Sequence, residues 1–291
     1  MKKFFAIALA LILLLSMVAC SKDGDTEEEG GEATKVVEND VYTDEEGIDS
    51  FTYVVNERGS YDISGFSSTD IEPHKVEIPS KIDNIEVTGI AAEAFKACNQ
   101  ISEIVIPDSV ISIGECAFAR MLYLEKVTMA DSVKTLGTPI QEVIDEEVVS
   151  YIKGGVFDGC TALVDVTLSG AIEVLPQYTF RNCIALEKIV LPKSVKEIAE
   201  GAFWGCDALV DITLPEALEI IGDCAFYEAD ALAQITVPAS VKTIGKYAFT
   251  KLEGNDAFVV ESVKDSAASE YAEANGHVFK DIDAVEETPA E

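Results

Sequence analysis

The chain has 291 residues, and its 53 acidic residues against 21 basic residues give it a formal net charge of −32. Nucleic acids and anionic membrane surfaces bind proteins through clusters of lysine and arginine. A charge this negative therefore argues against both as direct partners of the folded protein.

Residues 1–19 have the form of an export signal. A basic start precedes an apolar run over residues 4–19, which is shorter than a membrane-spanning helix, since such a helix needs about 20 residues. The run ends in M-V-A-C, which resembles the cleavage box of bacterial lipoproteins. That resemblance implies acylation of Cys20 and anchoring of the exported chain to the outer face of a bacterial membrane, through the lipid only. An ordinary secretory signal with an unrelated cysteine is the alternative.

Residues 20–50 are expected to form a disordered acidic linker. Positions 21–50 hold twelve acidic residues and two lysines. Such a segment cannot bury enough apolar surface to offset the entropy of ordering it. The next segment, 51–73, has two apolar stretches on either side of N-E-R-G, which predicts a hairpin that caps the first end of the fold.

Phenylalanines recur at a fixed spacing through the middle of the chain. The spacing is the same between all successive members except for one longer interval, from Phe118 to Phe157. A fixed period of about 23 residues is typical of a solenoid, in which each repeat buries its apolar face against its neighbours. We therefore expect seven such repeats over residues 74–254. The phenylalanines are Phe95, Phe118, Phe157, Phe180, Phe203, Phe226 and Phe249.

Each repeat predicts one short strand and one turn. Ile104 and Ile106 would face inward, because successive side chains of a strand alternate between its two faces. Pro107 would end the strand, since proline cannot donate to a ladder. A following glycine such as Gly114 suits a turn that needs backbone freedom. The fold class is therefore a single elongated solenoid of short parallel β-strands with irregular or 3-10 turns and little α-helix.

These columns closely resemble the BspA-type leucine-rich repeat of bacterial cell-surface proteins. The recurring unit is L-x-x-I-x-I-P-x-S-V-x-x-I-G-x-x-A-F-x-x-C, and the resemblance covers roughly residues 51–280. It implies a non-catalytic surface protein that mediates adhesion or protein–protein recognition. Leucine-rich repeats generally bind their partners on the strand surface, so that surface is the candidate site.

Two columns of side chains are expected to point outward from the strands. The first alternates in charge, and opposite charges on neighbouring strands stabilise a sheet by roughly 0.2–1 kcal/mol per pair. The second is a flat column of valine and threonine. Both columns fit a partner-binding face, and both also fit any stable exposed sheet. The first is Glu103, Lys126, Asp165, Lys188, Asp211 and Gln234, and the second is Val105, Thr128, Thr167, Val190, Thr213 and Thr236.

The long interval contains an insertion at 138–153. Thr138 and Pro139 have the form of a helix cap and a first helical residue. The apolar residues fall at helical spacing, which predicts an amphipathic helix that either packs on the body or docks a partner. A strand over 147–152 is the alternative. The candidate docking residues are Ile140, Val143, Ile144, Val148, Tyr151 and Ile152.

Residues 255–291 predict a C-terminal cap followed by an acidic tail. Residues 257–260 have the pattern of a last strand. A short helix is expected from Ser266 to Ala274, and the Asn-Gly pair that follows is typical of a helix C-terminus.

The cysteines follow the repeat and not a metal-binding spacing. Cys98 with Cys116, and Cys206 with Cys224, occupy equivalent places on adjacent repeats. An exported protein can oxidise such pairs, so disulfides are an open alternative to buried free thiols.

The remaining residues offer no arrangement for catalysis. His74 and His277 are the only histidines and lie near opposite ends of the chain. We expect no enzyme activity, no cofactor, no metal site and no nucleic-acid partner.

The expected function is recognition of a protein at the cell surface by a lipid-anchored monomer. A carbohydrate-binding surface protein is the alternative, but it would need aromatic side chains aligned on one face, and the two outward columns contain none. Trp204, the only tryptophan, is either a semi-exposed contact or part of the packing.

Overall fold

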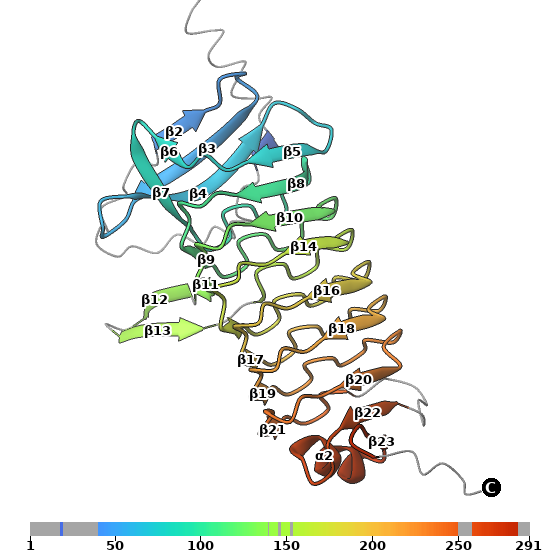
Figure 1. Cartoon of the computed structure of the whole chain (residues 1–291). Helices are drawn as coiled ribbons and strands as arrows, with labels where there is room; N and C mark the ends of the chain where they lie inside the picture. The colour runs from blue at the N-terminus through green and yellow to red at the C-terminus, as the bar shows by residue number, and fades with distance from the viewer. Residues whose placement is uncertain are drawn as a thin grey trace, which may run out of the picture.

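The computed structural model describes residues 18–19, 40–138, 140–144, 147–151, 154–249 and 258–284. They form an elongated β-solenoid of about 9 turns with a single helix near the C-terminus (Figure 1). The predicted fold class is therefore confirmed. Cys20, most of the expected signal, the linker up to residue 39 and the end of the acidic tail lie outside the described residues.

One side of the solenoid carries a row of parallel strands, and we call its outward surface the strand face (Figure 1). Side chains alternate as predicted: in the strand over 188–190, Ile189 is buried between the exposed Lys188 and Val190. The row is β5 (His74–Glu77), β8 (Ile101–Ile106), β10 (Lys126–Met129), β14 (Asp165–Thr167), β16 (Lys188–Val190), β18 (Asp211–Thr213), β20 (Gln234–Thr236), β22 (Val259–Ser262) and β23 (Val278–Asp281).

A second row of shorter parallel strands runs along the opposite side, where the sequence predicted only turns (Figure 1). Gly114 belongs to this row, and a Cβ built on it would lie 2.4 Å from the backbone nitrogen of Ala92. Glycine is thus required there by the close approach of two coils, and not by backbone freedom. The row is β7 (Ile85–Ile90), β9 (Ser112–Gly114), β11 (Thr135–Thr138), β15 (Val174–Leu175), β17 (Glu197–Ile198), β19 (Ile220–Ile221) and β21 (Thr243–Ile244).

The seven repeating phenylalanines form a continuous spine through the core. Neighbouring ring centroids along it are 5.2–5.6 Å apart, and every ring is almost completely buried. Phe66 of the N-terminal cap and Phe258 of the C-terminal cap continue the stack at its two ends. Aromatic pairs contribute about 0.5–1.5 kcal/mol each beyond the burial of their area. The spine therefore couples the two caps through every coil.

Most of the repeating phenylalanines lie between two residues with left-handed backbone. Gly201 and Gly205 flank Phe203 with φ of 58° and 68°, whereas Cys116 and Arg120 flank Phe118 with φ of 53° and 59°. Glycine adopts this conformation readily, while other residues lose about 1–2 kcal/mol in it. The coils therefore share one turn geometry but differ in the strain they carry.

An antiparallel sheet closes the first end. β3 (Asp49–Val55) and β4 (Tyr61–Ser68) form a hairpin where the sequence places one, and β4 continues onto β7, which also pairs with β6 (Lys81–Ile82). β1 (Val18–Ala19) pairs with β4. β2 (Asp40–Thr43) pairs with β3, so the expectation of disorder does not hold for residues 40–50. The carboxylate of Asp44 helps to order this segment, because it accepts the N–H groups of Ile48 and Asp49 at 2.8 and 3.2 Å.

The C-terminal cap contains the expected strand and helix. Helix α2 (Ala267–Asn275) begins after Ser266, whose side chain accepts the N–H of Ser269, and ends at Gly276 in left-handed conformation. The strand β23 that follows was not predicted and pairs with β22. Within the described residues, the helix is too short and too polar to cross a membrane.

The insertion at 138–153 is a β-hairpin, so the predicted amphipathic helix is wrong. β12 (Ile140–Ile144) pairs antiparallel with β13 (Glu147–Tyr151), and the hairpin projects from the second row (Figure 1). Valine and isoleucine lose side-chain freedom in a helix, which favours the strand. Of the candidate docking residues, β12 holds Ile140, Val143 and Ile144, β13 holds Val148 and Tyr151, and Ile152 lies outside the described residues.

Most cysteines of the repeats pack in the core, whereas Cys224 is half-buried, and Cys98 is disulfide-bonded. Cys116, Cys206 and Cys224 are free thiols, so the two disulfide alternatives do not form. Buried thiols of this column donate to the preceding coil: Cys206 Sγ lies 3.1 Å from the carbonyl oxygen of Phe180. Burial raises the pKa of Cys160 to about 12. A thiol with such a pKa is unreactive near neutral pH.

Candidate functional site

The strand face brings the first predicted column into register. Parallel pairing places Lys126 between Glu103 on β8 and Asp165 on β14, and its Nζ lies 3.6 Å from Oδ2 of Asp165. The register of β16 and β18 likewise places Lys188 beside Asp211. Opposite charges thus alternate along these strands as the sequence predicted, whereas their role in binding stays a prediction.

The second column is aligned equally well. Val105, Thr128 and Thr167 are cross-strand neighbours on β8, β10 and β14, and Val190 lies beside Thr213. The side chains are half-buried on β8 and β10 and exposed on the later strands. The strand face is therefore a flat β-branched surface beside a column of charges.

The C-terminal cap extends this column in a way that the sequence did not predict. Thr236 on β20 lies opposite Glu261, and its hydroxyl donates to Oε2 of that carboxylate at 2.8 Å. Lys280 Nζ lies 2.6 Å from the other oxygen, Oε1. Hydrogen bonds from Lys280 and Thr236 lower the pKa of Glu261. This end of the strand face is therefore engaged by the protein's own side chains.

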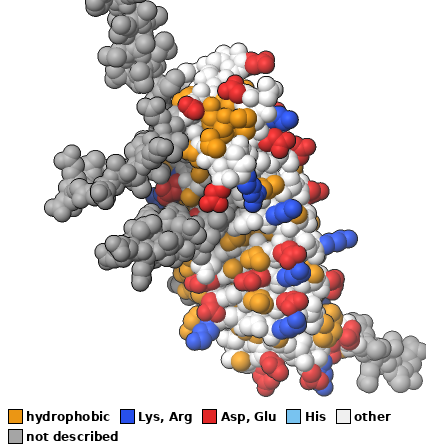
Figure 2. Space-filling view, turned by 90° about the vertical axis from the view of Figure 1, so that its left-hand side faces the viewer, with side chains coloured by type: hydrophobic (Ala, Val, Ile, Leu, Met, Phe, Trp, Pro, Cys, Tyr) orange, Lys and Arg blue, Asp and Glu red, His pale blue; other side chains and the backbone are white. Residues whose placement is uncertain are grey.

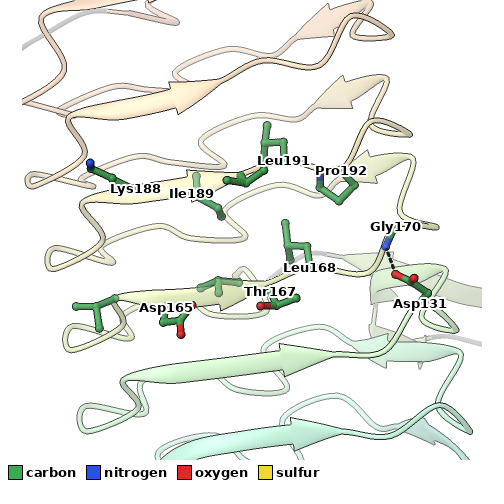
Figure 3. Close-up of a pocket in the computed structure, with 12 residues that line it drawn as sticks. Asp131, Asp165, Thr167, Leu168, Gly170, Lys188, Ile189, Leu191 and Pro192 are labelled. Atoms are coloured by element: carbon green, nitrogen blue, oxygen red, sulfur yellow. Dashed lines mark hydrogen bonds between the residues drawn. The ribbon is translucent and has the colours of Figure 1, made fainter.

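The ladder of the strand face is interrupted between β14 and β16. Within the described residues, β14 pairs with β10 and β16 pairs with β18, but the two do not pair with each other. A similar interruption separates β18 from β20. Between β14 and β16 lies a hollow of about 570 Å³, which we call the β14/β16 cleft (Figure 3). Its lining comes mainly from residues 164–168 and 188–192.

The cleft has an apolar floor. Leu168 and Ile189 lie between the two strands and are 8% and 4% exposed (Figure 3). Val190 on the wall is 79% exposed, more than any other large apolar side chain of the described residues. Val164 at the start of the other wall is also exposed. An apolar side chain can therefore leave water at this point of the strand face.

The rim of the cleft is charged. Asp131, Asp165 and Lys188 contribute two carboxylates and one ammonium group. The Oδ1 atom of Asp131 accepts the N–H of Gly170 at 2.7 Å (Figure 3). This hydrogen bond joins the turns of two neighbouring coils and fixes the Asp131 side chain. Asp165 is engaged only loosely by Lys126, at 3.6 Å and with more than half of its side chain exposed. The rim is therefore net acidic and open to a ligand.

The insertion leaves the solenoid at the same level on the opposite side. β11 pairs with β9 and β15 pairs with β17, but β11 and β15 do not pair within the described residues. The coil that contains β14 and β15 is thus bonded to the preceding coil through the strand face and to the following coil through the second row. The two interruptions flank this one coil.

Buried polar contacts hold the return of the insertion into the solenoid. The N–H of Gly154 donates to Oε1 of Glu115 at 2.9 Å, and Glu115 is almost fully buried. Arg181 Nε donates to Oδ1 of Asp158 at 2.9 Å in the next coil. A buried, charge-assisted contact of this kind is costly to break. The base of the hairpin is therefore fixed to the body.

The side of the second row differs from the strand face. Figure 2 shows acidic and basic side chains interspersed over this side, without a large patch of one sign. Ion pairs join successive coils here, with Nζ to Oε2 distances of 2.9 Å for Lys196 with Glu173 and 2.6 Å for Lys242 with Glu219. These charges are thus partnered within the protein.

Aromatic side chains gather beside the turns and not on the strand face. Trp204 makes an edge contact with Tyr227 at 5.1 Å between ring centroids, and its Nε1 donates to Oε2 of Glu228 at 2.9 Å. Its polar group is thus satisfied by the next coil. Trp204 contributes to packing between coils, which was one of the two sequence interpretations.

The two histidines are built into the two caps. His74 Nε2 lies 3.0 Å from Oδ1 of Asp49 in the first cap. His277 packs between Tyr271 and Phe258 in the second. Among the residues that the structure describes, no group of three or more His, Cys, Asp and Glu side chains is arranged to hold a metal ion.

The repeats match a known family. The BspA type leucine rich repeat region matches residues 88–142 and 137–255, with six copies. These matches cover more than half of the chain. The chain belongs to the BspA-type leucine-rich repeat family.

A solved structure gives the same fold. The T. pallidum leucine rich repeat protein is 22% identical with a TM-score of 0.55, and the match covers 79% of this chain and 95% of that one. A leucine rich cell surface protein of Faecalibacterium prausnitzii is 26% identical with a TM-score of 0.49, over 72% of this chain and 52% of that one. No curated protein matches the chain.

Sequence reasoning found the strand face but missed the β14/β16 cleft. Its lining residues occupy ordinary repeat positions, and Leu168 and Leu191 look like any other inward residue of a strand. The only signal in the sequence was the long interval between Phe118 and Phe157, next to this coil. That signal points to the level of the cleft but not to the side on which it opens.

Proposed function

We propose that the protein is a non-catalytic, exported lipoprotein whose strand face recognises another protein at the cell surface. The lipid anchor is Cys20, and the acidic segment after it separates the solenoid from the membrane. The protein acts as a monomer with no cofactor.

The observation that carries this proposal is the composition of the strand face. It is a long, flat surface on which exposed β-branched side chains run beside charges of alternating sign. Protein interfaces combine apolar contact with polar groups that fix register. Membership of the BspA-type family supports the same role.

Protein recognition is favoured over carbohydrate binding by the position of the aromatics. Sugar rings stack on exposed aromatic faces, and the two outward columns of the strand face hold none. Trp204 already donates to Glu228 within the protein.

The recognition role is tested by comparing two pairs of charge reversals in the full-length chain. Lys126→Glu with Lys188→Glu changes the strand face, and Lys196→Glu with Lys242→Glu makes the same charge change on the second row. Proteins captured from extracts of host and neighbouring cells are compared by mass spectrometry. We expect the first pair to abolish a specific capture and the second to preserve it. Equal capture by both, or binding to a glycan array alone, would contradict the proposal.

The anchor is tested separately by metabolic labelling with radioactive palmitate. Label is expected in the wild-type chain and absent from Cys20→Ala. Unchanged labelling of the variant would show that the lipid lies elsewhere.

A further inference from the structure

We infer that the β14/β16 cleft docks an extended, positively charged segment of the partner protein. This inference rests on the proposed function, because it assigns the place and the chemistry of one contact on the strand face. Three features carry it: unpaired strand edges, an apolar floor beside exposed valines, and an acidic rim.

The first feature is the pair of strand edges that face each other across the cleft. Within the described residues, β14 and β16 share no ladder hydrogen bonds. Main-chain N–H and C=O groups at such edges need partners from water or from another chain. An extended polypeptide that lies over the cleft can supply these partners through its own backbone N–H and C=O groups. The edges therefore favour a polypeptide over a small molecule.

The second feature is the apolar surface. The floor of Leu168 and Ile189 is continuous with Val190, which is 79% exposed. The volume of about 570 Å³ is within the roughly 300–1,000 Å³ of ligand sites. It is enough for one or two side chains but not for a whole strand. One apolar side chain of the segment therefore enters the cleft, and the rest of the segment lies along the strand face.

The third feature is charge. Asp131 and Asp165 on the rim outnumber Lys188, and the chain as a whole carries −32. Such a field attracts cationic segments and repels anionic ones. Lysine or arginine residues that flank the inserted side chain would meet Asp165, whose carboxylate is only loosely engaged by Lys126. The occupant therefore alternates apolar and basic residues.

The insertion and the cleft adjoin the same coil. The coil of β14 and β15 loses its second-row ladder to β11, which the inserted hairpin follows, and loses its strand-face ladder to β16. Phe157 and Phe180 remain stacked across the cleft, with ring centroids 5.5 Å apart.

The test uses a fluorescein-labelled peptide of four Val-Lys repeats and its acidic counterpart of four Val-Glu repeats, with binding to the full-length chain measured by fluorescence anisotropy. The basic peptide should bind at least about tenfold more tightly than the acidic one. Val190→Arg should weaken its binding by about tenfold, because the added side chain fills the cleft and opposes the ligand charge.

Val174→Arg is the matched control. It makes the same substitution at an exposed valine of β15 in the second row, on the opposite side from the cleft, and should change the affinity by less than about twofold. Circular dichroism and thermal unfolding establish that both variants are folded. Equal affinities of wild type and Val190→Arg, or equal losses in the two variants, would overturn the cleft as the docking site.

Failure of this inference is distinguishable from failure of the proposed function. If the strand-face charge reversals abolish capture of the natural partner while Val190→Arg leaves that capture intact, the strand face is the interface and the cleft is not. If neither change affects capture, both proposals fail.

Discussion

The coils before and after the insertion use the same repeat but are bonded differently. Up to and including the first coil after it, the strand-face ladder β5–β8–β10–β14 is continuous, with strands of four to six residues up to β10. In the later coils, the described strands of the strand face are joined as β16–β18 and β20–β22–β23, while the second row β15–β17–β19–β21 is continuous. The phenylalanine spine passes through both regions with almost unchanged spacing.

The comparison shows that the distance between coils stays almost constant where the strand-face ladder is interrupted. The spine, the buried aliphatic residues and backbone hydrogen bonds beside the spine, such as that from the N–H of Phe157 to the carbonyl oxygen of Thr179 at 2.9 Å, hold neighbouring coils together there. A missing ladder then leaves edges and a cleft on an otherwise rigid surface. In a protein whose repeats contact only their neighbours, such a local change is tolerated without disturbing the rest.

The largest expected effect comes from breaking the spine at the boundary between the two regions. Phe180 stacks at 5.5 Å on both Phe157 and Phe203. Phe180→Ala should lower the free energy of unfolding by about 3–5 kcal/mol through the cavity it leaves. Urea denaturation measures this loss. Val190→Ala, on the exposed surface, is the control and should change the free energy by less than about 0.5 kcal/mol. A similar small change for Phe180→Ala would show that the ladders, and not the spine, hold the coils.

Deleting residues 138–153 should erase the difference between the two regions. The interval from Phe118 to Phe157 then shortens to the common period of the repeats, so β11 and β15 can pair as the other second-row strands do. We expect slower amide hydrogen exchange in β14 and β16, and about tenfold weaker binding of the basic peptide. The control keeps the hairpin and replaces Asp145 and Glu146 with Ser and Gly. If amide exchange and peptide binding are unchanged in the deletion variant, the insertion does not determine the cleft.

A smaller effect is expected from the left-handed turn residues, which differ between the two regions. Ala97, before the insertion, is exposed with φ of 59°, whereas the equivalent Gly205 has φ of 68°. Ala97→Gly should therefore stabilise the protein by about 0.5–1 kcal/mol, and Gly205→Ala should destabilise it by about 1 kcal/mol or more. Urea denaturation of the two variants checks the opposite signs. Shifts of the same sign would contradict the strain assigned to these turns.

The two caps should respond to pH in opposite directions. Burial alone would lower the pKa of His74, but the Glu72 carbonyl and Asp49 raise it overall, whereas burial lowers the pKa of His277. The stability from His74 is then present below pH about 6.5 and is lost as the pH rises through the raised pKa. The stability from His277 is present above pH about 6.5 and is lost as the pH falls.

Urea unfolding at pH 5.5 and pH 8 tests these signs. His74→Gln should cost more stability at the lower pH, and His277→Leu should cost more at the higher pH. The same pH dependence in both variants would contradict the assignment.

The sequence predicted the features that recur in every repeat, such as which side chains face inward. It did not predict the features that depend on contacts between neighbouring coils. The Phe203 position, the inward Ile189 and the outward Lys126 recur with the period of the repeat, so their faces follow from that period. The second row was missed because strands such as Val174–Leu175 are too short to show an alternating pattern.

The insertion was misread for a different reason. Its apolar residues fit a helical period, but β-branched residues such as Val143 and Val148 favour the hairpin that the structure contains. For so short a segment, the helix and the hairpin differ only slightly in intrinsic propensity. The hydrogen bond between Glu115 and Gly154, which holds the base of the hairpin, lies outside the segment and could not be read from it. The cleft was not predictable, because its lining residues occupy ordinary repeat positions.

Hydrogen exchange of the full-length chain with and without the basic Val-Lys peptide tests the central claim most directly. Recognition on the strand face predicts slower exchange in residues 164–168 and 187–191, with no change in the second-row strands β17 and β19. Unchanged exchange on the strand face, or protection of β17 and β19 instead, would contradict the account.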